Sequence, residues 1–144
     1  MRTSISLALL AAVAMIGSTA VSAAESTGKT LYATLSGANE VNGGDPDGTG
    51  MATVRINPGR GSLCYSINVS NIAPATMAHV HDGDAGSAGP VVRGLTAPTS
   101  GSSEGCATIS RELAISIITD PEGHYVNVHN AEYPGGAIRG QLEK

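Results

Sequence analysis

Short runs in which apolar and polar residues alternate are the feature that most restricts how this chain can fold. The runs cover residues 30–36, 51–57 and 63–69, and Gly, Asn, Asp or Pro residues separate them. Their apolar positions are Leu31, Ala33, Leu35, Ala52, Val54, Ile56, Leu63, Tyr65, Ile67 and Val69. Alternation with a period of two is typical of strands with one buried face. It predicts an all-β fold, a Greek-key-like antiparallel β-sandwich or barrel.

One segment departs from this alternation and predicts a short helix. Residues 110–119 carry apolar side chains at helical spacing, namely Leu113, Ala114, Ile117 and Ile118. Ser110 is a suitable residue to cap the first turn, and the dipeptide Asp120–Pro121 ends the helix. We expect this helix to connect two strands of the sandwich.

The amino-terminal residues read as a targeting segment and not as part of the domain. Residues 1–24 combine a positively charged start, an apolar run over residues 5–16 and a small, polar end, which is the layout of a secretory signal peptide. The apolar run is shorter than the roughly 20 residues that span a bilayer, so a membrane anchor is the less favoured alternative. We expect a lead-in at residues 25–29, one domain at residues 30–144, and a periplasmic or extracellular address without membrane attachment after cleavage.

The composition predicts which side chains fill the core and which covalent bond stabilises it. Phe and Trp are absent, so the core must consist of Val, Ile, Leu and Ala with the four Tyr residues. The two cysteines are Cys64 and Cys106, and pairs of cysteines in exported proteins usually form disulfides. We therefore predict a disulfide between them, with two free thiols or thiolate metal ligands as the alternative.

Charge and motif content exclude several classes of function. The formal net charge is −4, Lys and Arg do not cluster, and aromatic residues are scarce, which disfavours nucleic-acid binding and adhesion to anionic lipid. The sequence has no G-x-S-x-G elbow and no Walker-type loop. We expect a protein that binds and does not catalyse.

A degenerate internal repeat predicts two similar hairpins. AHVH at residues 78–81 precedes a glycine-rich loop and VVRGL at residues 91–95. VNVH at residues 126–129 precedes a proline–glycine loop and AIRGQL at residues 137–142. Each copy reads as a strand ending in Val-His, a turn and a second strand, so a histidine lies at the mouth of each loop.

The same residues carry a family resemblance. The segments LYATLSGANEV, AHVHDGDAGSAGPVV and YVNVHNAEYPGGAIRGQL, together with the two cysteines, resemble the CHRD (chordin-type) domain family over residues 30–142. The resemblance implies a β-sandwich of the immunoglobulin-like or superoxide-dismutase-like kind. It also implies an extracellular binding role, as in chordin, which binds growth factors. His124 stands where this family more often has Tyr, so no family role is carried onto it.

Three of the four histidines form a candidate metal site. On a strand, His79 and His81 point to one side, opposite to Val80. Tyr125, Asn127 and His129 point away from the core side of Val126 and Val128. If the two strands are neighbours, His79, His81 and His129 share one outer surface and could bind Cu²⁺ or Zn²⁺. We favour copper, because the ligands would all be imidazoles and partly exposed. Candidates to orient the imidazole N–H groups are Asp82, Asp84 and Asn127.

Two alternatives to a metal-binding module remain open. In the first, the histidines only hydrogen-bond the glycine-rich turns of a structural or protein-interaction module. A small dismutase-like redox enzyme is a further alternative, but it needs a fourth ligand, a supporting metal or a basic rim that the sequence does not show. For the two arginines of the repeat, Arg93 and Arg139, we expect ion pairs; the candidate partners are Glu40, Glu132 and Glu143.

Overall fold

The computed structural model describes residues 28–144, so the expected signal peptide and most of the lead-in lie outside the described residues. The strands form one eight-stranded antiparallel sheet in the order β5-β4-β7-β8-β1-β2-β3-β6. They are β1 (Lys29–Ser36), β2 (Thr49–Asn57), β3 (Ser62–Ser70), β4 (Ala75–Asp82), β5 (Val91–Leu95), β6 (Ser102–Thr108), β7 (His124–Asn130) and β8 (Ile138–Gln141). The all-β prediction is confirmed.

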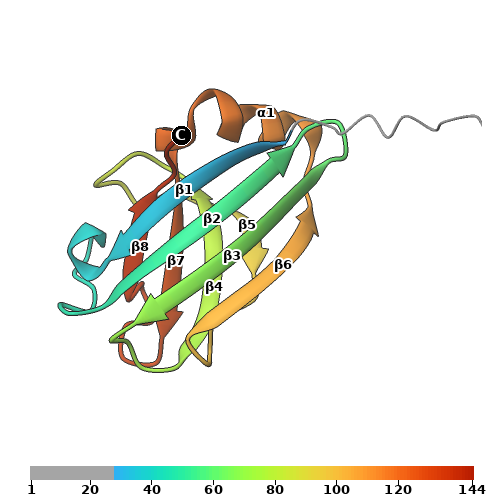
Figure 1. The fold of residues 1–144 in the computed structure, drawn as a ribbon. Coiled ribbons are helices and arrows are strands. Elements are labelled where there is room, and N and C mark those ends of the chain that lie inside the picture. The colour runs from blue at the N-terminus through green and yellow to red at the C-terminus, as the bar shows by residue number, and fades with distance from the viewer. Residues whose placement is uncertain (1–27) are drawn as a thin grey trace, which may run out of the picture.

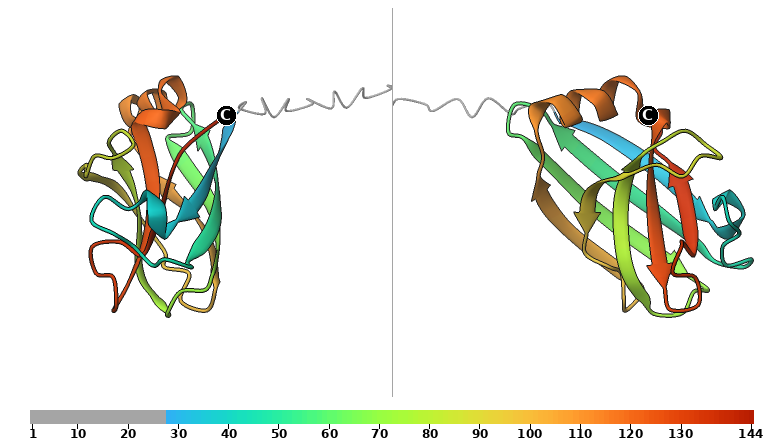
Figure 2. Two further views of the ribbon diagram at one scale, coloured as in Figure 1. Left: turned by 90° about the vertical axis from the view of Figure 1, so that its left-hand side faces the viewer. Right: turned by 180° about the vertical axis from the view of Figure 1, so that it is seen from behind.

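The sheet folds over on itself to make two layers. β1, β2, β3 and β6 run diagonally across the front of Figure 1, and β4, β7 and β8 lie behind them, as the rear view in Figure 2 shows. The layers join where β1 meets β8 at the single pair Ser36–Arg139. The result is a sandwich that approaches a closed barrel, with β5 and β6 as the two ends of the sheet.

The core lies between the layers and follows the alternation in the sequence. Alternate residues in the middle of β1, β2 and β3 are buried, including all three apolar positions predicted for β1, and Val69 near the end of β3 is partly buried. The second layer contributes Val80, Val126, Val128 and Ile138, each fully buried. Aliphatic side chains therefore fill nearly all of this core, with Tyr65 as its aromatic member.

The predicted helix is present as α1 (Arg111–Thr119), which lies across one end of the sandwich in Figure 1. The Ser110 hydroxyl accepts a hydrogen bond from the Leu113 backbone N–H at 3.1 Å, which caps the first turn as expected. Two 3₁₀ turns complete the elements, η1 (Gly37–Asn39) and η2 (Pro121–Gly123). Within residues 28–144, no helix has the length and apolar character needed to cross a membrane.

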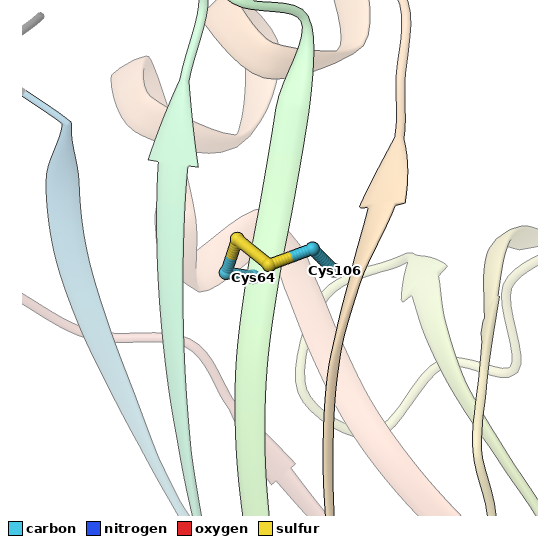
Figure 3. Close-up of a disulfide and its surroundings, with 2 residues drawn as sticks. All are labelled: Cys64 and Cys106. Atoms are coloured by element: carbon cyan, nitrogen blue, oxygen red, sulfur yellow. A yellow bond between two sulfur atoms is a disulfide. The ribbon is translucent and has the colours of Figure 1, made fainter.

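The predicted disulfide joins two neighbouring strands of the front layer (Figure 3). Cys64 on β3 and Cys106 on β6 are directly paired across the sheet, with their Cα atoms 3.9 Å apart, and their sulfur atoms are bonded. The bond lies on the outer surface, because Leu63 and Tyr65 on either side of Cys64 point into the core. The disulfide therefore ties the edge strand β6 to the sheet.

Candidate metal centre

The two histidine-bearing strands lie side by side, which the sequence argument required. β4 pairs with β7 in the antiparallel sense, and both are visible as neighbours in the rear view of Figure 2. The cross-strand pairs on their outer face are Met77–His129, His79–Asn127 and His81–Tyr125. Directly paired residues of antiparallel strands point to the same side of a sheet. The three histidines of the repeat therefore share one face, opposite to the core.

The three imidazoles converge on one another. The Nδ1 atom of His79 lies 3.1 Å from the Nε2 atom of His129. The Nε2 atoms of His81 and His129 lie 3.0 and 3.1 Å from the Oδ1 atom of Asn127. One nitrogen from each of the three rings falls within 4.8 Å of the others. Strand pairing alone thus assembles three nitrogen donors around a single point.

Backbone carbonyl groups fix the orientation of two of these rings. His81 Nδ1 donates to the carbonyl oxygen of Gly89 at 2.9 Å, and His129 Nδ1 donates to that of Pro134 at 3.0 Å. A carbonyl oxygen can only accept a hydrogen bond, so the proton of each neutral ring must sit on Nδ1. Each Nε2 atom then presents its lone pair to the centre, which is the tautomer that a metal ligand needs.

Asn127 lies between the two fixed rings. Its side-chain amide is buried, and it faces the Nε2 atoms of both His81 and His129. The atom that lies between them is Oδ1, and a half-turn of the side-chain amide exchanges it with the NH₂ group, which can then donate to the lone pairs of both Nε2 atoms. A cation at the centre would satisfy them instead. Asn127 is therefore suited to hold the rings together when no ion is bound.

The surroundings favour the neutral form of two imidazoles, those of His79 and His129. Burial lowers the pKa of His79, and the neighbouring His129 and His81 rings lower it further. Burial also lowers the pKa of His129, although the hydrogen bond to Pro134 acts in the opposite direction. Both rings are accordingly unprotonated at neutral pH. Neither ring therefore has to lose a positive charge before a metal ion binds. In the contact with His129 Nε2, His79 Nδ1 is the donor, so its proton moves to Nε2 when Nδ1 binds a metal.

A stacked pair of side chains covers one flank of the cluster. The ring of Tyr125 stacks on His81 with centroids 4.6 Å apart and planes 7° from parallel. The guanidinium carbon of Arg139 lies 3.5 Å from the centroid of the same tyrosine ring. Arg139 is buried, and it donates to the carbonyl oxygens of Ser87 at 2.7 Å and Asp84 at 2.9 Å. These bonds hold the loop of residues 83–90 over the outer face of β7.

Comparison with protein families adds to this geometry. The family model for the CHRD domain matches residues 31–142, which is most of the chain and nearly all of the described fold.

The chain belongs to the CHRD domain family.

No curated protein and no solved structure matches it. CHRD domains are extracellular, which suggests a binding module, and the Cys64–Cys106 disulfide is consistent with export.

The histidine face of this CHRD domain is more enclosed than the sequence predicted. We expected a partly exposed surface cluster, but His81 is only 8% exposed and His129 only 7%, while His79 is half-buried. Every residue of β7 is buried, including those on its outer face. The reason lies in the two loops that follow the histidines: the loop of residues 83–90 contacts His81 and Tyr125, and Pro134 of the second loop contacts His129.

Several predicted contacts of this CHRD domain are wrong in detail. The carbonyl groups of the two loops orient the imidazoles, a role we had assigned to Asp82 and Asp84; of the three candidates only Asn127 touches the rings. The hydrogen bonds of the two arginines go mainly to backbone carbonyl groups: Arg93 donates to that of Thr108 at 3.0 Å, and Arg139 donates to that of Ser87 at 2.7 Å. Among the expected carboxylates, Glu40 interacts with the positive charge of Arg139, which opposes the rise in the pKa of Glu40. A guanidinium group offers five donors, so Arg139 can bind several carbonyl groups at once.

Other residues of the site carried no clear signal in the sequence. Tyr125 and Arg139 belong to the repeat blocks, yet nothing in their spacing indicates that they stack beside the cluster. Gly89 and Pro134 act through backbone atoms, which any residue possesses. His124 lies outside the cluster, as its position on the core side of β7 predicted, and its Nδ1 atom donates to the Asp120 carbonyl oxygen at 2.9 Å.

The donor set fits a small divalent or monovalent ion with soft or borderline character. Zinc–nitrogen bonds of about 2.0–2.1 Å place the ligands of a tetrahedral ion roughly 3.3 Å apart. The His79–His129 nitrogen pair already has a spacing of 3.1 Å. All the ligand nitrogen separations within the cluster are at most 4.8 Å, so an inward movement of about 1.5 Å or less brings the third ring into such a shell.

A separate pocket does not contribute to this site. Its volume is about 480 Å³, and its lining includes Glu40, Val41, Gly86 and Gln141 but no histidine. This pocket is therefore distinct from the triad.

Proposed function

We propose that this CHRD domain is an exported binding module that holds a copper or zinc ion between its two carboxy-terminal hairpins. His79, His81 and His129 are the ligands. The export signal is the leader at residues 1–24, and the site faces the periplasm or the exterior of the cell. The proposal concerns binding, and no catalytic step is part of it.

One observation carries the proposal. Two loops that are 45 residues apart in the sequence each supply a carbonyl group to the Nδ1 atom of a histidine, at Gly89 for His81 and at Pro134 for His129. Both bonds turn an Nε2 lone pair toward the same point. Histidines that served only to close their own loops would make the same Nδ1 bonds but would not need a third imidazole at 3.1 Å.

The test is a titration of the purified, disulfide-bonded protein with Zn²⁺ and with Cu²⁺. We expect one equivalent to bind tightly. The His79→Ala and His129→Ala variants should each bind more than about tenfold more weakly, because even the loss of an outer partner of a ligand commonly costs 10- to 100-fold in affinity. His79 is the more exposed of the two, so its replacement should leave the fold intact.

His124→Gln is the matched control, because it removes the one histidine outside the triad. This variant should retain the affinity of the unmodified protein, provided that circular dichroism shows it to be folded. Weak binding that is equal in all four proteins would contradict the proposal. The domain would then be a structural or protein-interaction module whose histidines close its loops.

A further inference from the structure

The two flanks of the triad differ in chemistry. On one flank the cross-strand partner of His81 is Tyr125, which stacks on it and is covered in turn by Arg139. On the other flank the cross-strand partner of His129 is Met77. Tyr125 is buried, whereas Met77 is 45% exposed. The cluster is therefore sealed at its tyrosine side and reaches solvent at its methionine side.

An approximate twofold symmetry relates these flanks. In the pairing of β4 with β7, His79 is opposite Asn127, so the two strands can be exchanged about a point between these residues. This exchange superimposes the position of His81 on that of His129, and the position of Tyr125 on that of Met77. Met77 therefore occupies the same cross-strand position relative to His129 that Tyr125 occupies relative to His81. It also precedes His79 by two residues, so both point to the same face of β4.

The methionine side chain is long enough for its sulfur to reach the cluster from this position. Directly paired residues of antiparallel strands have Cβ atoms about 4.5–5.5 Å apart. Methionine is unbranched and has three rotatable bonds, so its thioether can swing across this gap. The exposed fraction of Met77 leaves it free to do so.

We propose that Met77 supplies a thioether ligand beside the three imidazoles and thereby makes the site selective for Cu(I) over Zn²⁺. This inference rests on the proposed function, because it assumes that the triad binds a metal. Thioether sulfur is a soft ligand that favours Cu(I), whereas zinc is well served by imidazole and water. Three nitrogen donors and one sulfur donor give a four-coordinate shell with Met77 on its solvent side.

The test compares Cu(I) and Zn²⁺ affinities of the unmodified protein and of Met77→Leu. Cu(I) is maintained with ascorbate and measured by competition with a chromophoric chelator, and Zn²⁺ is measured by competition with a fluorescent one. We expect Met77→Leu to bind Cu(I) about tenfold or more weakly and Zn²⁺ within about threefold of the unmodified protein. X-ray absorption at the copper edge should show a sulfur neighbour that the variant lacks.

Met51→Leu is the matched control. Met51 is 56% exposed on β2 in the other layer, so its replacement makes the same chemical change away from the triad. It should change neither affinity. Unchanged Cu(I) affinity in Met77→Leu, with binding lost in His129→Ala, would overturn this inference and leave the proposed function intact. Equal loss of Cu(I) and Zn²⁺ in Met77→Leu would also overturn it, since Met77 would then act on the fold. No binding by the unmodified protein would overturn both.

Discussion

Glu40 shows how a single side chain makes the stability of this domain depend on pH. Its Oε1 atom is buried without a hydrogen-bond partner, and its carboxylate lies so close to Gly136 that a side chain there would overlap it. Burial raises the pKa of Glu40 from 4.5 to about 7, and the positive charge of Arg139 opposes only part of this shift. Folding therefore favours the protonated form of this carboxyl group.

We predict that Glu40→Gln stabilises the protein at pH 8 and leaves it nearly unchanged at pH 4.5. Between pH 4.5 and about 7 the folded state binds more protons at Glu40 than the unfolded state, so stability from this group falls as pH rises. Gln is uncharged, like the protonated acid, so Glu40→Gln removes this loss of stability at high pH. Allowing for partial exposure, the gain at pH 8 should be about 1–2 kcal/mol in urea unfolding.

The control for this prediction is Glu104→Gln, which changes an exposed carboxylate on β6. Its effect should stay within about 0.5 kcal/mol at both pH values. The depressed pKa values of His79 and His129 make stability rise with pH up to about 6.5, but this contribution is common to all three proteins and cancels in the comparison. A Glu40→Gln gain that is the same at pH 4.5 and pH 8 would contradict the charge argument.

The sequence could predict the direction of side chains but not their burial. The period of two is enough to place His79, His81 and His129 on one face, provided that β4 and β7 are neighbours. Whether that face meets solvent depends on where residues 83–90 lie, and that is decided by hydrogen bonds from Arg139 and Gln141 to carbonyl groups of the loop. Such contacts join residues more than 50 positions apart and leave no periodic pattern.

At the scale of elements, the two hairpins follow one plan with different loops. Each strand ends in Val-His, and each histidine is held by a carbonyl group of the loop that follows it. The repeat therefore predicted the hairpins correctly. It could not predict the loop carbonyl groups, because the loops differ in sequence and the contact uses only backbone atoms. In the first loop, the backbone of Gly89 also packs directly against the carbonyl group of Asp82, and a Cβ atom at this position would overlap that group.

We predict that Gly89→Ala weakens both the fold and the metal site. The added methyl group must push residues 82 and 89 apart, which should destabilise the protein by about 2 kcal/mol. The displaced carbonyl group no longer fixes His81, so Zn²⁺ affinity should fall about 10- to 100-fold. Gly94→Ala, on β5, is the control, because a Cβ there meets nothing within 4 Å. Weaker folding with unchanged Zn²⁺ affinity would show that the Gly89 carbonyl group does not position the ring.

At the scale of the whole molecule, the sandwich has one weak seam, between β5 and β6 at the two ends of the sheet. Side chains bridge it in place of a backbone ladder. Arg93 of β5 donates to the Thr108 carbonyl oxygen at 3.0 Å, and Ser103 of β6 donates to that of Thr96 at 2.8 Å. None of the seven residues of β6 is fully buried. The edge strand therefore depends on its ladder with β3 and on the disulfide.

We predict that replacing both cysteines, in Cys64→Ser/Cys106→Ser, destabilises the domain without altering the metal site. The bond joins residues separated by 42 positions, and the chain-entropy model gives a loss of about 4 kcal/mol for a loop of that length. Urea unfolding measures this loss, and hydrogen exchange should show β6 opening before the other strands. The triad belongs to the opposite layer, so Zn²⁺ affinity of the folded variant should stay within about threefold. A decrease in the free energy of unfolding of less than about 1 kcal/mol would mean that the ladder and the seam contacts hold β6 without the covalent bond. A large fall in Zn²⁺ affinity would mean that the two layers are coupled through the core.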